Sequence, residues 1–164
     1  MKNADAIRIA TWNCRQGSHA KGERLIETYS PDIAVIQEIK NAGKVNDEHY
    51  VWMPNTLTKS LGVAIISSGV LTLEALPVNP GLPEVFVPVR VKGKVNFNLL
   101  GVWTQSAGNY VESFPRILDV YDSFLRESPC VITGDFNSNP LWNKEYKKFC
   151  HTDLEKRLAD DFDL

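Results

Sequence analysis

Apolar residues in this chain come mainly in short runs that end at glycine, proline or polar residues, which is typical of β-strands. Two turns between such runs, at Ser68-Gly69 and Lys92-Gly93-Lys94, are predicted to close hairpins. The runs predict seven or eight strands: Ile7–Trp12, Ile33–Ile36, Gly62–Ser67, Val70–Leu76, Val85–Val91, Val95–Trp103 and Cys130–Ile132, with one further short strand at Tyr50–Met53.

Helical spacing of apolar residues predicts two or three helices among these strands. The candidates are Gly22–Tyr29, Glu112–Arg126 and the mostly helical stretch Leu141–Leu158. The first helix lies between the first two strands, an order that favours a partly parallel pairing. Interleaved strands and helices of this kind indicate sheets that pack on each other and are covered by helices.

Length and composition are those of an ordinary soluble domain, which we take to span residues 1–164. The net charge of −2 differs from the basic charge that a dedicated nucleic-acid-binding protein usually carries. Three cysteines without metal-type spacing fit a reduced, cytoplasmic setting best. No apolar run reaches the roughly 18 residues that cross a membrane.

The stretch Cys130–Pro140 carries the clearest candidate chemistry. Asp135 and Asn137 follow its apolar run and, in extended backbone, would face one side together while Phe136 faces the other. A carboxylate beside an amide is one half of a plausible Mg²⁺ site, since this ion takes oxygen ligands. The competing interpretation is an ordinary turn, because Asp and Asn after glycine often bond their own backbone.

Two other strands are also predicted to end in residues with oxygen side chains, the first at Asn13 and the second at Gln37-Glu38. If the three strands lie side by side, their ends converge at a crevice where ligands bind in such sheets. Acidic and amide oxygens without His or Cys point to Mg²⁺ or Mn²⁺ rather than zinc.

Together, these residues resemble the endonuclease/exonuclease/phosphatase (DNase I-like) superfamily. The resemblance rests on Ile9–Asn13, Pro31–Glu38 and Gly134–Asn137, which come in the family's order at compatible spacing. It implies an α/β (α+β) four-layer α/β/β/α sandwich of two mixed sheets. It also implies a metal-dependent hydrolase of phosphate esters, most simply a phosphodiesterase or nuclease that uses Mg²⁺ or Mn²⁺. Its substrate would be a phosphate ester, with nucleic acid among the candidates.

Roles can be carried over at the matching positions as expectations. Glu38 would be the principal metal ligand, and Asn13 would hold metal or a phosphate oxygen. Asp135 would contribute to the metal site and orient or deprotonate the attacking water, and Asn137 would assist through the phosphate or the water. The simpler interpretations are that Asn13 caps a loop and that Glu38 is a solvated charge at a strand end.

Several nearby residues have a simpler expected role than substrate binding. Trp103 is expected to lie in the core or at its rim, and Trp142 to pack against a helix rather than stack on a base. Lysines 144, 147 and 148 are expected to form a solvated helix face. No role is assigned to the three histidines.

The sequence departs from the family in one respect, because it contains no late Ser-Asp-His motif and no strands to carry it. This predicts a domain truncated at its C-terminus, with weak or no activity. The alternative to an enzyme is therefore a non-catalytic fragment or binding module that keeps the fold. An uncovered sheet edge would also favour self-association.

Overall fold

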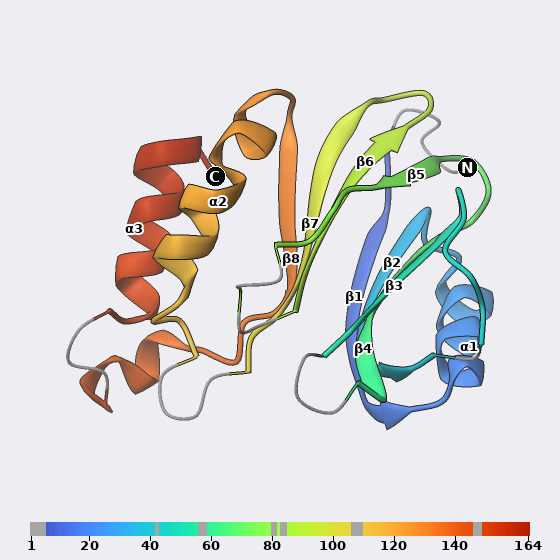
Figure 1. Cartoon of the computed structure of the whole chain (residues 1–164), viewed down its shortest axis with the longest axis horizontal. Coiled ribbons are helices and arrows are strands. Elements are labelled where there is room, and N and C mark those ends of the chain that lie inside the picture. Colours follow the sequence, from blue (N-terminus) through green and yellow to red (C-terminus); the bar gives the residue numbers. More distant parts are fainter. Residues whose placement is uncertain are drawn as a thin grey trace.

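The computed structural model describes residues 6–41, 43–55, 59–79, 82, 85–105, 110–145 and 149–164. Two β-sheets face each other, with helix α1 outside one sheet and helices α2 and α3 outside the other (Figure 1). The helices are α1 (His19–Tyr29), α2 (Phe114–Arg126) and α3 (His151–Phe162), with a short 3₁₀ helix η1 (Pro140–Glu145) before α3. The strands are β1 (Ile9–Gly17), β2 (Ile33–Lys40), β3 (Tyr50–Pro54), β4 (Leu61–Ser67), β5 (Thr72–Ala75), β6 (Val85–Lys92), β7 (Phe97–Trp103) and β8 (Cys130–Asp135).

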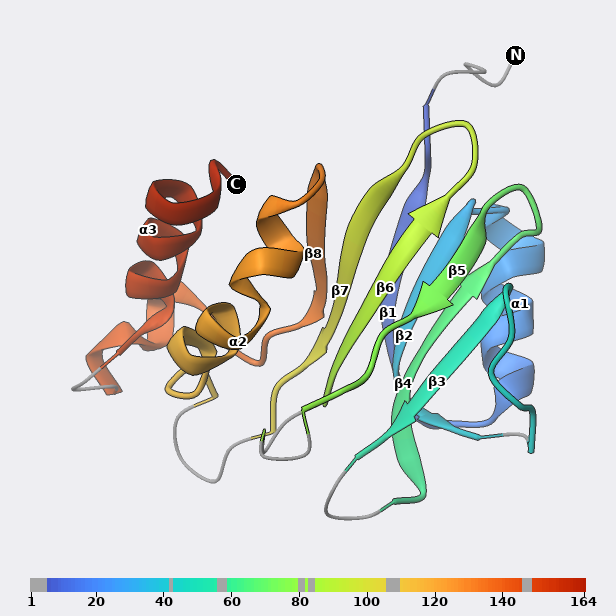
Figure 2. The same cartoon turned by 45° about the horizontal axis from the view of Figure 1, so that its top comes forward.

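Both sheets are mixed, as the predicted four-layer α/β sandwich requires. The first sheet has the order β1-β2-β4-β3, and only β1 and β2 are parallel in it. The second has the order β5-β6-β7-β8, and only β7 and β8 are parallel. Strand β1 contacts β8, and β3 contacts β5, so each edge strand of one sheet lies over an edge strand of the other (Figure 2). The predicted fold class is therefore confirmed.

One of the two predicted hairpins is wrong. Strands β6 and β7 pair as expected, whereas β4 and β5, on either side of Ser68-Gly69, belong to different sheets. Leu71 and Leu73 explain the difference, because both are buried in the core between the sheets and draw the chain across to the second sheet. The Ser68-Gly69 turn connects the two layers.

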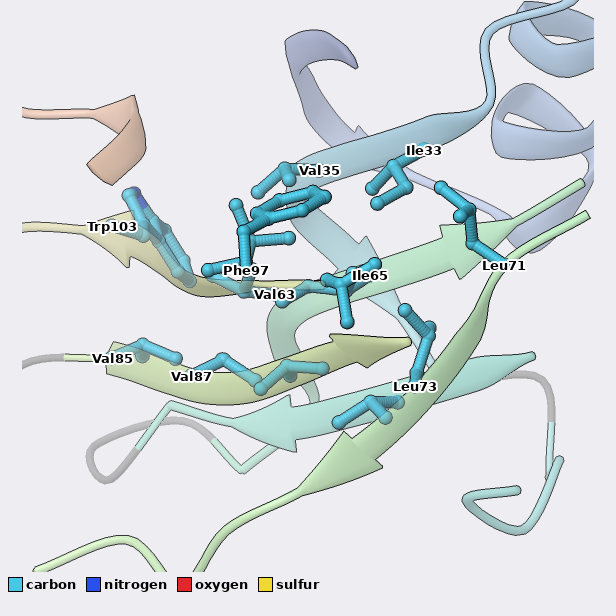
Figure 3. Close-up of a cluster of buried hydrophobic side chains, with 14 residues drawn as sticks. Ile33, Val35, Val63, Ile65, Leu71, Leu73, Val85, Val87, Phe97 and Trp103 are labelled. Atoms are coloured by element: carbon cyan, nitrogen blue, oxygen red, sulfur yellow. The ribbon is translucent and has the colours of Figure 1, made fainter. Parts of the chain in front are cut away.

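Strands with apolar residues on both faces build the three cores of the sandwich. In β2, Ile33 and Val35 point into the core between the sheets, while Ala34 and Ile36 pack toward α1. In the second sheet, the inward side chains of β6 and β7 fill the same inter-sheet core (Figure 3). Their outward side chains pack with α2 and α3. This arrangement fixes the two sheets face to face and sets the position of their strand ends.

Three predicted strand ends are also wrong, and all three lie at the candidate site. Strand β1 continues past Asn13, β2 continues past Glu38, and β8 runs through Gly134 to Asp135. The register shifts between Asn13 and Gly17 and again between Gln37 and Ile39. In β1 and β2 the apolar pattern ends at polar residues, but the pairing resumes after a bulge, which the pattern alone does not reveal. Strand β8 pairs with β7 without interruption as far as Asp135.

Across the residues that the structure describes, no helix combines the length and the apolar character needed to cross a membrane.

Candidate active site

The structure brings Asn13, Glu38 and Asp135 together from three strands of both sheets. The Nδ2 atom of Asn13 donates to Glu38 Oε1 at 3.0 Å and to Asp135 Oδ2 at 2.7 Å. The two carboxylate oxygens therefore lie close together, each within hydrogen-bond reach of one nitrogen. All three side chains are half-buried, so the cluster remains open to solvent on one side.

Glu38 reaches this cluster because it occupies the bulge in β2. Its φ angle is 57°, a left-handed value that non-glycine residues rarely adopt. A bulge re-aims a side chain that the ordinary strand alternation would direct elsewhere. The buried Cys14 thiol donates to the backbone oxygen of Glu38 at 3.4 Å, and burial raises the pKa of this thiol and keeps its proton.

Left-handed backbone is concentrated at this site. Of the seven non-glycine residues with positive φ that the structure describes, Arg15, Gln16, Glu38 and Asn137 lie in the segments that carry the cluster. Such residues cost on the order of 1–3 kcal/mol each and often mark functional sites. The strain here follows from observed dihedral angles and favours a functional role for the cluster.

Asp135 is placed by the glycine before it. Gly134 has a φ of 149°, and a Cβ atom at this position would lie 2.0 Å from the backbone oxygen of Val102. Only glycine therefore lets β8 approach β7 this closely. The pairing puts Asp135 opposite Trp103, at the end of β8 that meets β1 and β2.

Asn137 lies in a turn that is fixed at two points. Its backbone N–H donates to Asp135 Oδ1 at 3.0 Å, and its Nδ2 donates to the backbone oxygen of Thr104 at 2.9 Å. The turn interpretation of this motif is thus correct for Asp135, which at the same time bonds to Asn13. Phe136 faces away, as predicted, and stacks on Phe114 with ring centroids 5.4 Å apart.

The donor chemistry of the cluster fits a hard divalent cation. No salt bridge joins Glu38 or Asp135 to a basic side chain of the described residues. Nowhere among the described residues do three or more His, Cys, Asp or Glu side chains gather to hold an ion. Mg²⁺ commonly uses one or two carboxylates and completes its shell with water and substrate phosphate. Two carboxylates without a cationic partner suit it, whereas zinc would need more side chains.

Asn13 faces the carboxylates with its amide nitrogen, while its Oδ1 atom accepts the N–H of Arg15 at 2.9 Å. In this arrangement it bridges the carboxylates. A direct bond from Asn13 to metal would need the amide turned round, so this expected role stays a prediction.

The neighbouring residues take varied positions. Trp103 is a core residue, as predicted, with 4% of its surface exposed. Trp142 is exposed, so its predicted packing on a helix is not supported, and Lys144 is exposed as expected. Lysines 147 and 148 lie outside the described residues.

Two features of the site were missed in the sequence. Thr104, fully buried after β7, anchors the turn by donating to the backbone oxygen of Phe136 at 2.6 Å. The Nδ1 atom of His151 lies 2.7 Å from the hydroxyl oxygen of Ser138, the residue after Asn137. Neither had a local signal, because each contact joins segments that are distant in sequence.

No family model and no curated protein matches this sequence. Solved structures do match its fold. The endonuclease domain of TRAS1, a telomere-specific non-LTR retrotransposon, superposes with a TM-score of 0.66 at 17% identity, over 94% of this chain and 71% of that one. A functionally unknown conserved protein from Enterococcus faecalis V583 superposes with a TM-score of 0.60 at 17% identity, over 81% of this chain and 68% of that one.

ANGEL2, a 2',3'-cyclic phosphatase solved with adenosine-2',3'-vanadate, gives a TM-score of 0.63 at 15% identity, and this chain spans 56% of its length. These superpositions establish the fold, while identities this low leave the activity open. The resemblance seen in the three sequence motifs is thereby confirmed at the level of architecture, and this chain has the DNase I-like fold of the endonuclease/exonuclease/phosphatase superfamily.

Proposed function

We propose that this protein is a metal-dependent hydrolase of phosphate esters, and more narrowly a phosphodiesterase or nuclease that uses Mg²⁺ or Mn²⁺. The observation that carries the proposal is the joining of Glu38 and Asp135 by Asn13 at one end of the sandwich. The matching structures include an endonuclease and a cyclic phosphatase, which supports the same reaction class. The three cysteines are free thiols, which supports a reducing, cytoplasmic setting.

Glu38 and Asp135 would hold the cation through their carboxylate oxygens. When bound, such an ion stabilises the negative charge that develops on the phosphoryl and leaving oxygens. Asp135 Oδ2 is the atom that would orient the attacking water and accept its proton. Asn13 would keep the two carboxylates in register through its bonds to both.

Asn137 would bind the phosphate or the water near Asp135. Its left-handed backbone and its bond to Thr104 fix the position of its side chain. The side-chain amide of Asn13 would therefore position the carboxylates, and that of Asn137 the phosphate or the water. Asp135 would accept the proton. Among the described residues, no histidine bonds to any member of the cluster, so no group is evident that would protonate the leaving oxygen.

The lack of such a proton donor among the described residues favours a second candidate, a binding module that holds metal and phosphate without turnover. General acid–base help typically contributes about 10²–10⁴-fold to a rate, so its absence would leave hydrolysis slow. Metal binding combined with the absence of hydrolysis would support this second candidate.

The test is hydrolysis of bis(p-nitrophenyl) phosphate and of a short single-stranded DNA with Mg²⁺ or Mn²⁺. We expect slow, metal-dependent release of product that falls at least about 100-fold in Glu38→Ala and Asp135→Asn. Asp122→Asn, at an exposed carboxylate on α2 that pairs with Arg126, is the matched control and should keep the wild-type rate. Equal rates in all four proteins would overturn the assignment of the site.

A further inference from the structure

The first side chain of helix α3 contacts the turn of the candidate site. The structure places His151, the first residue of α3, with its Nδ1 atom 2.7 Å from the Ser138 hydroxyl. We propose that His151 is a positioning residue that holds the Asp135–Ser138 turn in its working shape. The proposal rests on the proposed function, because it concerns the same site.

The carboxylate beside Nε2 favours the neutral tautomer of the ring that carries its hydrogen on Nε2. Nε2 lies 3.3 Å from Glu155 Oε1, and a carboxylate can only accept a hydrogen bond. Nε2 of the neutral ring therefore carries the hydrogen, and Nδ1 is left as the acceptor. In this tautomer the Ser138 hydroxyl would donate to Nδ1, and the ring would set the orientation of the hydroxyl.

This bond gives the turn a second anchor from another layer. On the sheet side, the backbone oxygen of Thr104, just after β7, accepts the Asn137 side-chain amide. From the helix layer, His151 accepts the hydroxyl of the next residue along the chain. The side chain of Asn137 would keep its position best when both anchors hold, because the left-handed backbone of this residue is intrinsically unfavourable.

Other contacts already dock the start of α3, so the imidazole is not needed for docking. Asn143 Nδ2 bonds Thr152 Oγ1 at 2.6 Å, and Asn143 Oδ1 accepts the backbone N–H of His151 at 3.1 Å. The buried Leu154 holds the helix on the core beside α2. Among the polar contacts of the described part of α3, the one between Ser138 and His151 joins the helix to the residue after Asn137.

The experiment compares two substitutions of His151 that differ in where they place an acceptor. Asn puts an oxygen near the position of Nδ1 and should keep the Ser138 bond, whereas Gln extends its amide toward the position of Nε2 and should lose it. We expect His151→Gln and Ser138→Ala each to lower kcat about tenfold, and the double variant to fall no further. His151→Asn should retain most of the rate.

The matched control is Thr152→Val, which breaks the neighbouring Asn143 bond and leaves Ser138 and His151 in place. It should lower the melting temperature without changing kcat. An equal fall of kcat in Thr152→Val, or wild-type kcat in His151→Gln, would overturn the proposal.

A second readout separates this proposal from the proposed function. The side-chain amide of Asn137 gives its own NMR signals, and its exchange with water reports how firmly the turn is held. We expect faster exchange in His151→Gln and Ser138→Ala, and unchanged exchange in His151→Asn and Thr152→Val. If the wild type hydrolyses nothing, the proposed function fails while these signals still decide the positioning role. Unchanged exchange in His151→Gln would contradict it.

Discussion

Asn13 joins the two carboxylates of the candidate site with a single nitrogen. Without a cation, this amide is the group that offsets the repulsion between Glu38 and Asp135. We predict that Asn13→Asp, which replaces the donor by a third carboxylate, lowers the free energy of unfolding by about 2 kcal/mol in EDTA. Millimolar Mg²⁺ should restore most of the loss.

Urea unfolding with and without Mg²⁺ measures this effect. Asn13→Ser is the control, since it removes the bridge without adding charge and should gain less from the ion. If Asn13→Asp were as stable as the wild type in EDTA, the carboxylates would not be close enough to repel.

Glu38 combines a functional side chain with an unfavourable backbone. At its φ of 57°, a Cβ atom costs about 1–2 kcal/mol that glycine does not incur. We therefore predict that Glu38→Gly is about 1 kcal/mol more stable than Glu38→Ala, the reverse of the usual order within a strand. Chemical denaturation of the two variants checks this. A more stable alanine variant would mean that the bulge in β2 is absent.

At the scale of elements, the approach of β8 to β7 decides where Asp135 lies. Gly134 permits it, since any Cβ atom would collide with the Val102 backbone. We predict that Gly134→Ala costs about 3 kcal/mol of stability and also abolishes metal binding, because the end of β8 must shift. Gly43→Ala is the control, with a φ of 78° and open space around it, and should cost about 1 kcal/mol and leave metal binding intact. Similar losses in both would contradict this account of β8.

The elements also show what apolar patterning can and cannot predict. It predicted α2 and the β6–β7 hairpin well, because their core-facing residues are spaced as the rules require. It placed the ends of β1 and β2 too early, since bulges at polar residues interrupt the pattern without ending the ladder. It paired β4 with β5 because a short turn and two apolar runs look the same whether the chain returns to one sheet or crosses to another.

At the scale of the whole molecule, the two sides of the sandwich differ in how their edge strands are protected. On one side, β3 ends in Pro54 and the four-residue β5 carries Glu74, both of which discourage pairing. On the other side, β1 and β8 are the outer strands, and neither has a charge over Ile9–Cys14 or Cys130–Gly134.

We therefore keep the prediction that the chain self-associates through β1 or β8. Sedimentation velocity over about 5–200 µM should show a concentration-dependent dimer or larger species. Thr11→Pro, which cannot donate at this edge, should shift the distribution toward monomer. A wild type that is monomeric throughout the range would contradict the prediction.

The site could be anticipated from sequence because each of its residues follows an apolar run, and the three strands that contain these runs meet at one edge of the sandwich. Asn13, Glu38 and Asp135 were identified in this way, and the structure brings them together. Their detailed geometry could not be anticipated. The left-handed backbone at Glu38, the bridging by Asn13 and the anchoring of the turn by Thr104 all depend on tertiary contacts.

The central claim is that Glu38 and Asp135 together hold a divalent cation, and a Mn²⁺ titration followed by electron paramagnetic resonance tests it most directly. We predict one weak site in the wild type and at least about tenfold weaker binding in Glu38→Gln and in Asp135→Asn, because each loses one carboxylate ligand. Asp122→Asn should bind as the wild type does. Equal Mn²⁺ affinity in the wild type and Glu38→Gln would contradict the account.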